Sequence, residues 1–240
     1  MPVLLLRLAG PLQSWGSASR FARRATDPQP TKSGVIGLVA AALGFAREDS
    51  LAEFDGLRFG VRTDQPGRLI DDFQTARTLD GDSLPLSRRF YLSDAVFLAG
   101  LESGDRVQLE RFRAAIAAPR YPLFLGRRSC PPDGPILSWI VDEGLRVALR
   151  EADWQAGEVY RERRGSAARP LPVAIDADAS SGESGHLESK RDVPLSFDPR
   201  GRRYGIRAID SYSTPVPQTA TTAPPDDHDP LAVFTAEDQL

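Results

Sequence analysis

The residues best suited to bind an anion are Pro30-Thr31-Lys32-Ser33-Gly34, which open a run of small and apolar residues from Val35 to Gly44. Thr31 or Ser33 can cap a helix that begins here. The free backbone N–H groups at a helix start attract phosphate, and Lys32 would add a positive charge. The segment therefore predicts a phosphate-binding helix start, with a capped helix that binds nothing as the equal alternative.

Other side chains that could carry chemistry are sparse. The P-loop spacing G-x-x-x-x-G-K-[ST] is absent, so nucleotide hydrolysis is not expected. His186 lies in a Ser/Gly-rich loop and His228 in an acidic tail, and neither is placed like a catalytic base. The pair Asp71-Asp72 fits a turn or a salt bridge better than a metal site. Cys130 is the only cysteine, so no internal disulfide can form, and no Cys/His cluster has the spacing of metal ligands. Taken together, these side chains lead us to expect no catalytic residue, no metal and no cofactor.

Arginines gather in three further segments, two of which also contain a tyrosine, and each group could also be an ordinary charged surface. The groups are Arg20, Arg23 and Arg24; Arg88, Arg89 and Tyr91; and Arg120 and Tyr121 with Gly126, Arg127, Arg128 and Ser129. The planar fork of arginine suits phosphate oxygens, and an aromatic ring can stack on a base. Together with Lys32 and Ser33, these residues form one nucleic-acid site only if the fold brings the segments together.

The charge of the chain is unevenly distributed along its 240 residues. The formal net charge is −3, but residues 1–130 contain 18 Lys/Arg against 14 Asp/Glu, whereas residues 131–240 contain 12 against 19. The first part is therefore the better candidate for binding a polyanion. No apolar run approaches the roughly 18 residues of a membrane span, and the N-terminus does not resemble a secretion signal, so we expect a cytoplasmic protein with no membrane contact.

Apolar periodicity predicts the elements that must position these residues. The expected order is a strand at 3–8, a helix at 31–46, a short helix at 50–54, a strand at 57–63, hairpin strands at 69–77 and 90–101, a helix at 106–118 and a strand at 136–141. Strand, helix, strand, strand, helix, strand is the α+β pattern of ferredoxin-like and RRM-like domains. A hairpin with a polar tip at 78–89 would extend from the middle strands.

The remaining sequence has a weaker pattern. Short strands are expected at 145–149, 172–175 and 204–209, in a small β-rich region spanning 144–210. Residues 176–191 and the Pro/Thr/Asp-rich tail, 211–240, are candidates for disorder or for ordering on a partner. The predicted organisation is a domain at 1–143 with its hairpin at 69–101, followed by the β-rich region and the tail.

An ordered set of motifs resembles one known family. The motifs are RLAGPLQSWG at 7–16, PTKSGVIGLVAAALG at 30–44, YLSDA at 91–95, and Arg120-Tyr121 with LGRRSCP at 125–131. The chain is similar to the fifth Cas family of type I-E CRISPR Cascade, in the RAMP superfamily. The resemblance covers about residues 3–140 and implies an RRM-like palm, a β-hairpin thumb and a glycine-rich loop at 125–129.

The resemblance also implies a function. Such a subunit holds and caps the 5′ handle of the CRISPR RNA, kinks the guide at the handle–spacer boundary, and contacts the filament subunit CasC and the large subunit CasA. Target DNA would be reached only through the complex. Relatives in type I-C systems cleave precursor RNA, so metal-independent endoribonuclease activity is the alternative. A protein–protein adaptor that needs no RNA is a third possibility.

Overall fold

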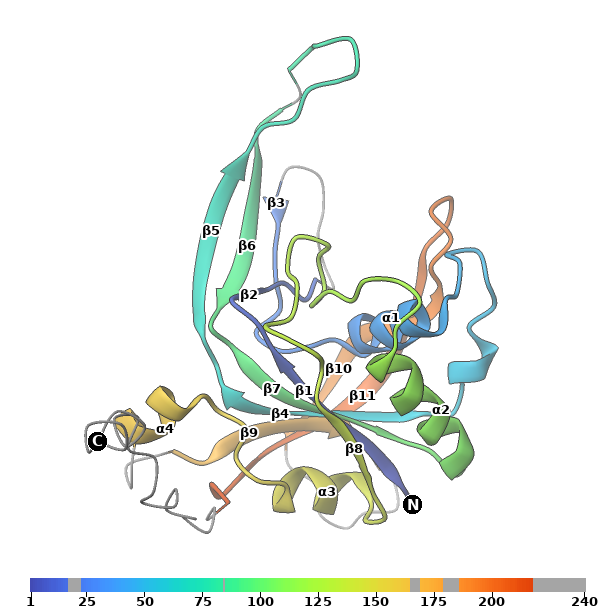
Figure 1. The fold of residues 1–240 in the computed structure, drawn as a ribbon, viewed down its shortest axis with the longest axis vertical. Helices are drawn as coiled ribbons and strands as arrows, with labels where there is room; N and C mark the ends of the chain where they lie inside the picture. The colour runs from blue at the N-terminus through green and yellow to red at the C-terminus, as the bar shows by residue number, and fades with distance from the viewer. Residues whose placement is uncertain (17–22, 84, 165–168, 179–185, 218–240) are drawn as a thin grey trace, which may run out of the picture.

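The computed structural model describes residues 1–16, 23–83, 85–164, 169–178 and 186–217. A seven-stranded antiparallel sheet forms the body of the molecule, and a β-hairpin projects from it (Figure 1). In spatial order, the strands of the sheet are β10 (His186–Ser196), β11 (Arg203–Thr214), β9 (Leu171–Asp176), β4 (Arg58–Gln65), β7 (Val96–Glu102), β1 (Val3–Ala9) and β8 (Ser138–Val141).

Helices cover both faces of this sheet. Helices α1 (Lys32–Leu43) and α2 (Arg106–Ala117) pack on one face, and α3 (Leu145–Glu151) packs on the other. A fourth helix, α4 (Glu158–Arg164), follows α3, and a short 3-10 helix spans Ala52–Phe54. Among the described residues, no helix has the length and apolar character needed to cross a membrane.

Strand β1 lies between β7 and the edge strand β8, and it is apolar on both faces because helices cover both sides of the sheet there. Leu4, Leu6 and Leu8 face α1 and α2, whereas Val3 and Leu5 face α3, and all five are fully buried. The α3 face needs room for a helix at close range, and a pair of facing glycines, Gly60 and Gly100, provides it. A Cβ at either glycine would come within 2.8 Å of a leucine side chain of α3.

The hairpin is part of a second, smaller sheet. Strands β5 (Arg68–Gln74) and β6 (Ser87–Ser93) form its two long arms. Two short strands, β2 (Leu12–Gln13) and β3 (Arg23–Arg24), also pair with β6. Since β5 occupies one edge of β6 along its whole length, β2 and β3 share the other edge, which faces the body of the molecule.

The expected mixture of helices and antiparallel strands is confirmed, with three differences of detail. The predicted strand at 90–101 is two strands, β6 and β7, separated at Asp94, whose φ of 54° turns the chain from the hairpin into the main sheet. The predicted strand at 145–149 is the helix α3, because Leu145, Ala148 and Leu149 are buried together at helical spacing.

The third difference concerns the predicted β-rich region. Strands β9, β11 and β10 continue the main sheet through the pairing of β9 with β4, so they do not form a sheet of their own. Of the two segments expected to be disordered, residues 186–191 belong to β10 and residues 211–214 to β11, whereas 179–185 and 218–240 lie outside the described residues.

Candidate nucleic-acid interface

Two of the predicted basic segments are neighbouring strands. In the parallel pairing of β3 with β6, Arg23 lies opposite Arg88 and Arg24 lies opposite Arg89. Like charges placed directly across a sheet repel one another. The arrangement therefore favours an anion beside the pair. Arg20 lies outside the described residues, as does the side chain of Arg23.

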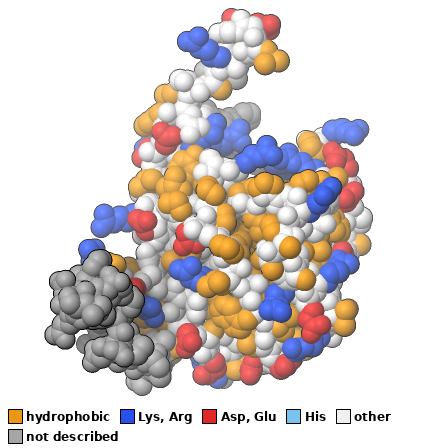
Figure 2. All heavy atoms as spheres, viewed as in Figure 1, with side chains coloured by type: hydrophobic (Ala, Val, Ile, Leu, Met, Phe, Trp, Pro, Cys, Tyr) orange, Lys and Arg blue, Asp and Glu red, His pale blue; other side chains and the backbone are white. Residues whose placement is uncertain are grey.

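Arg127 joins the third basic segment to these strands. Its guanidinium donates to the carbonyl oxygen of Phe90 in β6 at 3.2 Å and to that of Arg24 in β3 at 2.7 Å. It also lies 5.0 Å from the centre of the Tyr91 ring. We call Arg24, Arg88, Arg89, Arg127 and Arg128 the arginine cluster. Lys and Arg side chains gather at the foot of the hairpin and along the adjoining rim of the body (Figure 2).

The members of the cluster differ in what their side chains already contact. Arg88 is paired with Asp71 at 2.6 Å and stacks between Phe73 and Phe90, with its guanidinium 5.5 and 5.0 Å from the two ring centres. Arg128 is exposed and makes no hydrogen bond or ion pair with any residue that the structure describes. The cluster thus combines anchored guanidiniums with at least one that is available to a ligand.

The glycine-rich loop is held against the segment that follows β1. Gly126 has a φ of 85°, and a Cβ there would lie 1.9 Å from the carbonyl oxygen of Ser14. The Ser14 N–H donates to the carbonyl of Leu125 at 3.1 Å, and the Ser14 hydroxyl donates to the carbonyl of Phe90 at 3.0 Å. Only glycine allows this approach, which fixes the backbone from which Arg127 and Arg128 extend.

Gln13 and Trp15 complete the support and had no role assigned from sequence. The Gln13 side-chain amide donates to the carbonyl oxygens of Leu8 and Ala95, at 3.1 and 2.8 Å, and its oxygen accepts from the indole N–H of Trp15 at 2.9 Å. Both side chains are buried. A glutamine two residues before a tryptophan, directly after an apolar strand, was the available signal. Leu8 is near in sequence, but the other partner of Gln13, Ala95, lies 82 residues away.

Lys32 does not face an incoming anion, contrary to the expectation from sequence. Its ammonium group is buried, forms an ion pair with Asp176 at 2.8 Å and donates to the carbonyl of Leu57 at 2.6 Å. Its backbone N–H donates to the carboxylate of Asp192 at 2.9 Å. The start of α1 therefore does hold an anion, but that anion is a carboxylate from β10. Thr31 caps the helix through the N–H of Gly34 at 3.1 Å.

Asp192 is the centre of this buried network. Arg207 donates to its carboxylate at 2.6 and 3.0 Å and also pairs with Asp176 at 2.5 Å. Burial raises the pKa of Asp192, but the hydrogen bonds and positive charge of Arg207 outweigh that effect and hold the pKa below its ordinary value. Conversely, burial lowers the pKa of Arg207, but its bonds to the two aspartates raise it overall. The network joins α1 to β9, β10 and β11.

The other predicted residues fall into separate positions. Tyr91 is buried beneath Arg127, which leaves its ring no free face for a base. Arg120 and Tyr121 contact the opposite end of α1 from Lys32, where their backbone N–H groups donate to Ala42 and Ala41. Tyr121 is exposed. Ser33 is half-buried beside Thr31 at the start of α1. Ser129 is exposed in the glycine-rich loop, next to the buried Cys130. Burial raises the pKa of the Cys130 thiol.

The acidic residues and histidines do not form a metal centre in the part of the chain described. No group of three or more His, Cys, Asp or Glu side chains there is arranged to hold a metal ion. Asp71 is engaged by Arg88, as the salt-bridge interpretation of Asp71-Asp72 predicts. His186 is exposed at the start of β10 beside Glu188.

Known proteins are similar to this chain in sequence and in fold. Residues 3–210 match the family model described as CRISPR-associated protein (Cas_Cas5). The CRISPR system Cascade subunit CasD of Escherichia coli K12 is 31% identical over 182 residues, covering 66% of this chain and 80% of that protein.

Two solved structures are similar along most of the chain. A chain of a CRISPR RNA-guided surveillance complex has a TM-score of 0.71 and 34% identity, with coverage of 97% of this chain and 98% of that one. A structure described as a Cas protein has a TM-score of 0.67 and 38% identity, with coverage of 90% and 98%. With its sheet, its projecting hairpin and a family match that spans most of its length, this chain belongs to the CRISPR-associated Cas5 family.

Proposed function

We propose that this protein is a subunit of a CRISPR RNA-guided surveillance complex and that it holds the 5′ handle of the CRISPR RNA at the arginine cluster. The observation that carries the proposal is the convergence of three basic segments: β3 pairs with β6, and Arg127 bonds to both strands. Backbone phosphates would fix the position of the RNA, while base contacts would be few.

The accessible arginines are the proposed phosphate contacts. Arg24, Arg88 and Arg128 have exposed side chains, and Arg89 is half-buried beside Ser87. Arg127 is committed to the backbone carbonyls of Phe90, Arg24 and Ala25, so we assign it to holding the loop in place. Arg23 and Arg20 belong to the same basic segment and remain predicted contacts. Because Lys32 and Tyr91 are engaged inside the protein, we do not propose them as RNA ligands.

The projecting hairpin is the proposed element that deforms the guide. Strand β5 is exposed along nearly its whole length, including Leu69, Ile70 and Phe73. An exposed apolar strand beside a basic one offers both a surface for a neighbouring subunit and a wedge against unstacked bases. RNA that crosses the foot of this hairpin would be bent by it, which would place the kink at the handle–spacer boundary.

The body would act as a cap on the complex. The order β4-β7-β1-β8, with α1 and α2 on one face, supports our assignment of a ferredoxin-like palm.

The proposed partners are the filament subunit CasC and the large subunit CasA, and target DNA would be contacted only through the assembled complex. We propose a binding role and no catalytic one, because Lys32 and Tyr91, the lysine and tyrosine of the predicted site that could serve metal-independent cleavage, are held in an ion pair and under a guanidinium.

Crosslinking tests this assignment in the assembled complex. A guide RNA carrying 4-thiouridine at single handle positions is irradiated within the complex, and the attached peptides of this subunit are identified by mass spectrometry. We expect handle crosslinks in peptides containing residues 23–24, 87–90 and 126–129. The exposed face of α2 around Arg113 is the internal control and should stay unlabelled. Handle crosslinks that avoid all three segments would overturn the proposal.

A further inference from the structure

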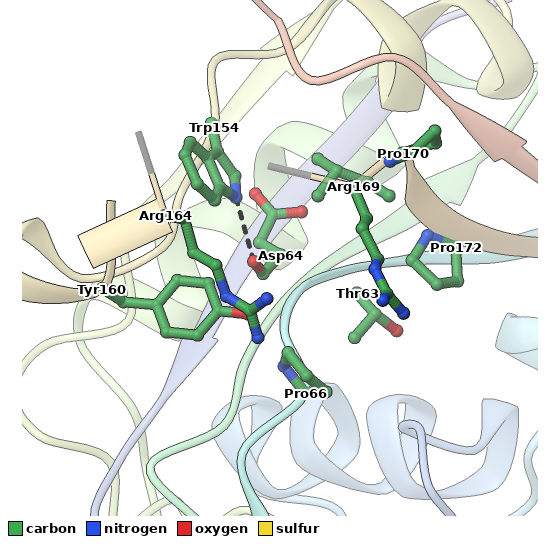
Figure 3. Close-up of a pocket in the computed structure, with 10 residues that line it drawn as sticks. Thr63, Asp64, Pro66, Trp154, Tyr160, Arg164, Arg169, Pro170 and Pro172 are labelled. Carbon is green, nitrogen blue, oxygen red and sulfur yellow. Dashed lines mark hydrogen bonds between the residues drawn. The ribbon is translucent and has the colours of Figure 1, made fainter. Parts of the chain in front are cut away.

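A second basic surface lies away from the arginine cluster, between α4 and the turn that joins β4 to β5. Two adjoining hollows of about 250 and 860 Å³ share Pro66, Tyr160 and Arg164 and together form what we call the α4 groove. In the smaller hollow, Arg164 and Arg169 project into the same space from two sides, with Trp154 and Tyr160 along one wall (Figure 3).

The groove carries an excess of positive charge. Arg68, Arg163 and Arg169 line it, and none of their guanidinium groups makes a hydrogen bond or an ion pair with a described residue. Arg164 stacks on Tyr160, with 5.2 Å between its guanidinium and the ring centre.

Three carboxylates also line the two hollows. They belong to Asp64, Asp94 and Glu158. The Asp64 carboxylate is already bound by the buried guanidinium of Arg62 at 2.7 Å. Four arginines against two remaining carboxylates leave the groove suited to an anionic ligand.

The aromatic wall of the α4 groove sets a second requirement for its ligand. Trp154 and Tyr160 pack edge to face, 6.1 Å apart, and the indole N–H of Trp154 is fixed by the carbonyl oxygen of Asp64 at 2.9 Å. Grooves lined by rigid aromatic rings suit proline-rich segments, which are extended before they bind and therefore lose little entropy. A ligand that is both acidic and rich in proline fits both features.

The chain's own C-terminal tail has this composition and starts beside the groove. Val216 packs with Tyr160 against the cluster that contains Trp154, and the described chain ends at the next residue, Pro217. Residues 218–240 contain five acidic residues and no Lys or Arg. Within them, Pro224-Pro225 directly precede Asp226-Asp227. Eight residues lie between Pro217 and Asp226, and this length of extended chain can span about 30 Å.

We propose that the acidic, proline-rich segment 224–230 of this chain binds in the α4 groove, with its aspartates against Arg163 and Arg164 and its prolines against Tyr160. Single-stranded nucleic acid is the competing anionic occupant. The tail is favoured because its tether holds it near the groove at an effective concentration in the millimolar range. The inference does not depend on RNA binding at the arginine cluster.

Disulfide trapping in the full-length chain tests the contact. Cysteines replace Val159, an exposed residue that lines the groove, and His228, which lies in the tail between the aspartates. The native Cys130 is fully buried and does not compete. The rate of intramolecular V159C–H228C disulfide formation is followed at low salt on non-reducing gels.

Charge-reversal variants of the groove and of the tail then test whether opposite charges hold the two together. R163E/R164E should slow trapping about tenfold, which corresponds to about 1.4 kcal/mol, and adding D226R/D227R should restore the rate. The control R202E/R203E, at the far end of β11, changes the net charge equally and should leave the rate unaltered. An equal rate in R163E/R164E, or a failure of the swap to restore it, contradicts the proposal. Protection of V159C from alkylation by single-stranded RNA, with slow trapping in the parent, would instead identify nucleic acid as the occupant.

Discussion

Arg24 lies directly opposite Arg89 across the short parallel pairing of β3 and β6, and the carbonyl of Arg24 accepts a hydrogen bond from Arg127. The loop that carries Arg128 is therefore attached to the strand that carries Arg24. The backbone pairing therefore brings two like-charged side chains to facing positions on neighbouring strands. A phosphate backbone would relieve the repulsion, and this relationship underlies the proposed RNA site.

Arg127 and Arg128 should behave differently although they are adjacent. R127A removes bonds to the carbonyls of Phe90 and Arg24, so we expect the free energy of unfolding to fall by about 1–3 kcal/mol. R128A should weaken RNA binding and leave the urea midpoint unchanged. Urea denaturation and RNA titration of both variants check this. An unstable R128A with wild-type RNA affinity would reverse the two roles.

The glycine-rich loop should not tolerate a side chain at its turn. G126A places a Cβ against the Ser14 carbonyl in a left-handed backbone conformation, so we expect a loss of at least about 2 kcal/mol in the free energy of unfolding. G134A is the matched control, because nothing lies within 4 Å of the added Cβ. Urea denaturation should separate the two variants, and equal stabilities would show that the loop can move away from Ser14.

Helices and strands could be predicted from the sequence where their apolar pattern was long enough. The apolar residues of β1 and the helical spacing of Leu109, Phe112 and Ile116 in α2 both predicted the observed structure. The five residues at 145–149 were too few to distinguish a helix from a strand by their apolar pattern. In the structure they form a helix, which buries Leu145, Ala148 and Leu149 against the sheet.

The site was harder to predict because its contacts join distant parts of the chain. The charge of Lys32 suggested an anion site, but its partners Asp176 and Asp192 lie 144 and 160 residues away. The meeting of three basic segments depends on β3, which has only two residues and leaves no periodic signal. The segments themselves could be named from sequence, whereas their pairing required the fold.

The buried network around Asp192 predicts acid sensitivity. The pKa of Asp192 is held below its ordinary value in the folded protein, so the unfolded chain binds the proton more readily. Its stabilising effect is fully present above about pH 4, near the pKa of an unfolded aspartate, and is lost as the pH falls through the folded-state pKa.

The variant D192N isolates this effect. It leaves Arg207 without the charge of one partner and should lower the free energy of unfolding by about 3–5 kcal/mol at neutral pH. Its unfolding free energy should also depend less on pH below about pH 4. Urea denaturation from pH 3 to 7, about the range over which aspartates titrate, checks both expectations. An unchanged pH profile would show that other carboxylates control acid unfolding.

The salt dependence of handle binding tests the central claim most directly. The affinity of the full chain for a handle RNA is measured over a series of salt concentrations, and the log–log slope is compared between wild type, R24A/R89A/R128A and the control R113A, an exposed arginine on α2. Each lost phosphate contact lowers the slope by about 0.7, so the triple variant should lose about 2 and R113A nothing. A wild-type slope in the triple variant would show that the arginine cluster does not hold the RNA.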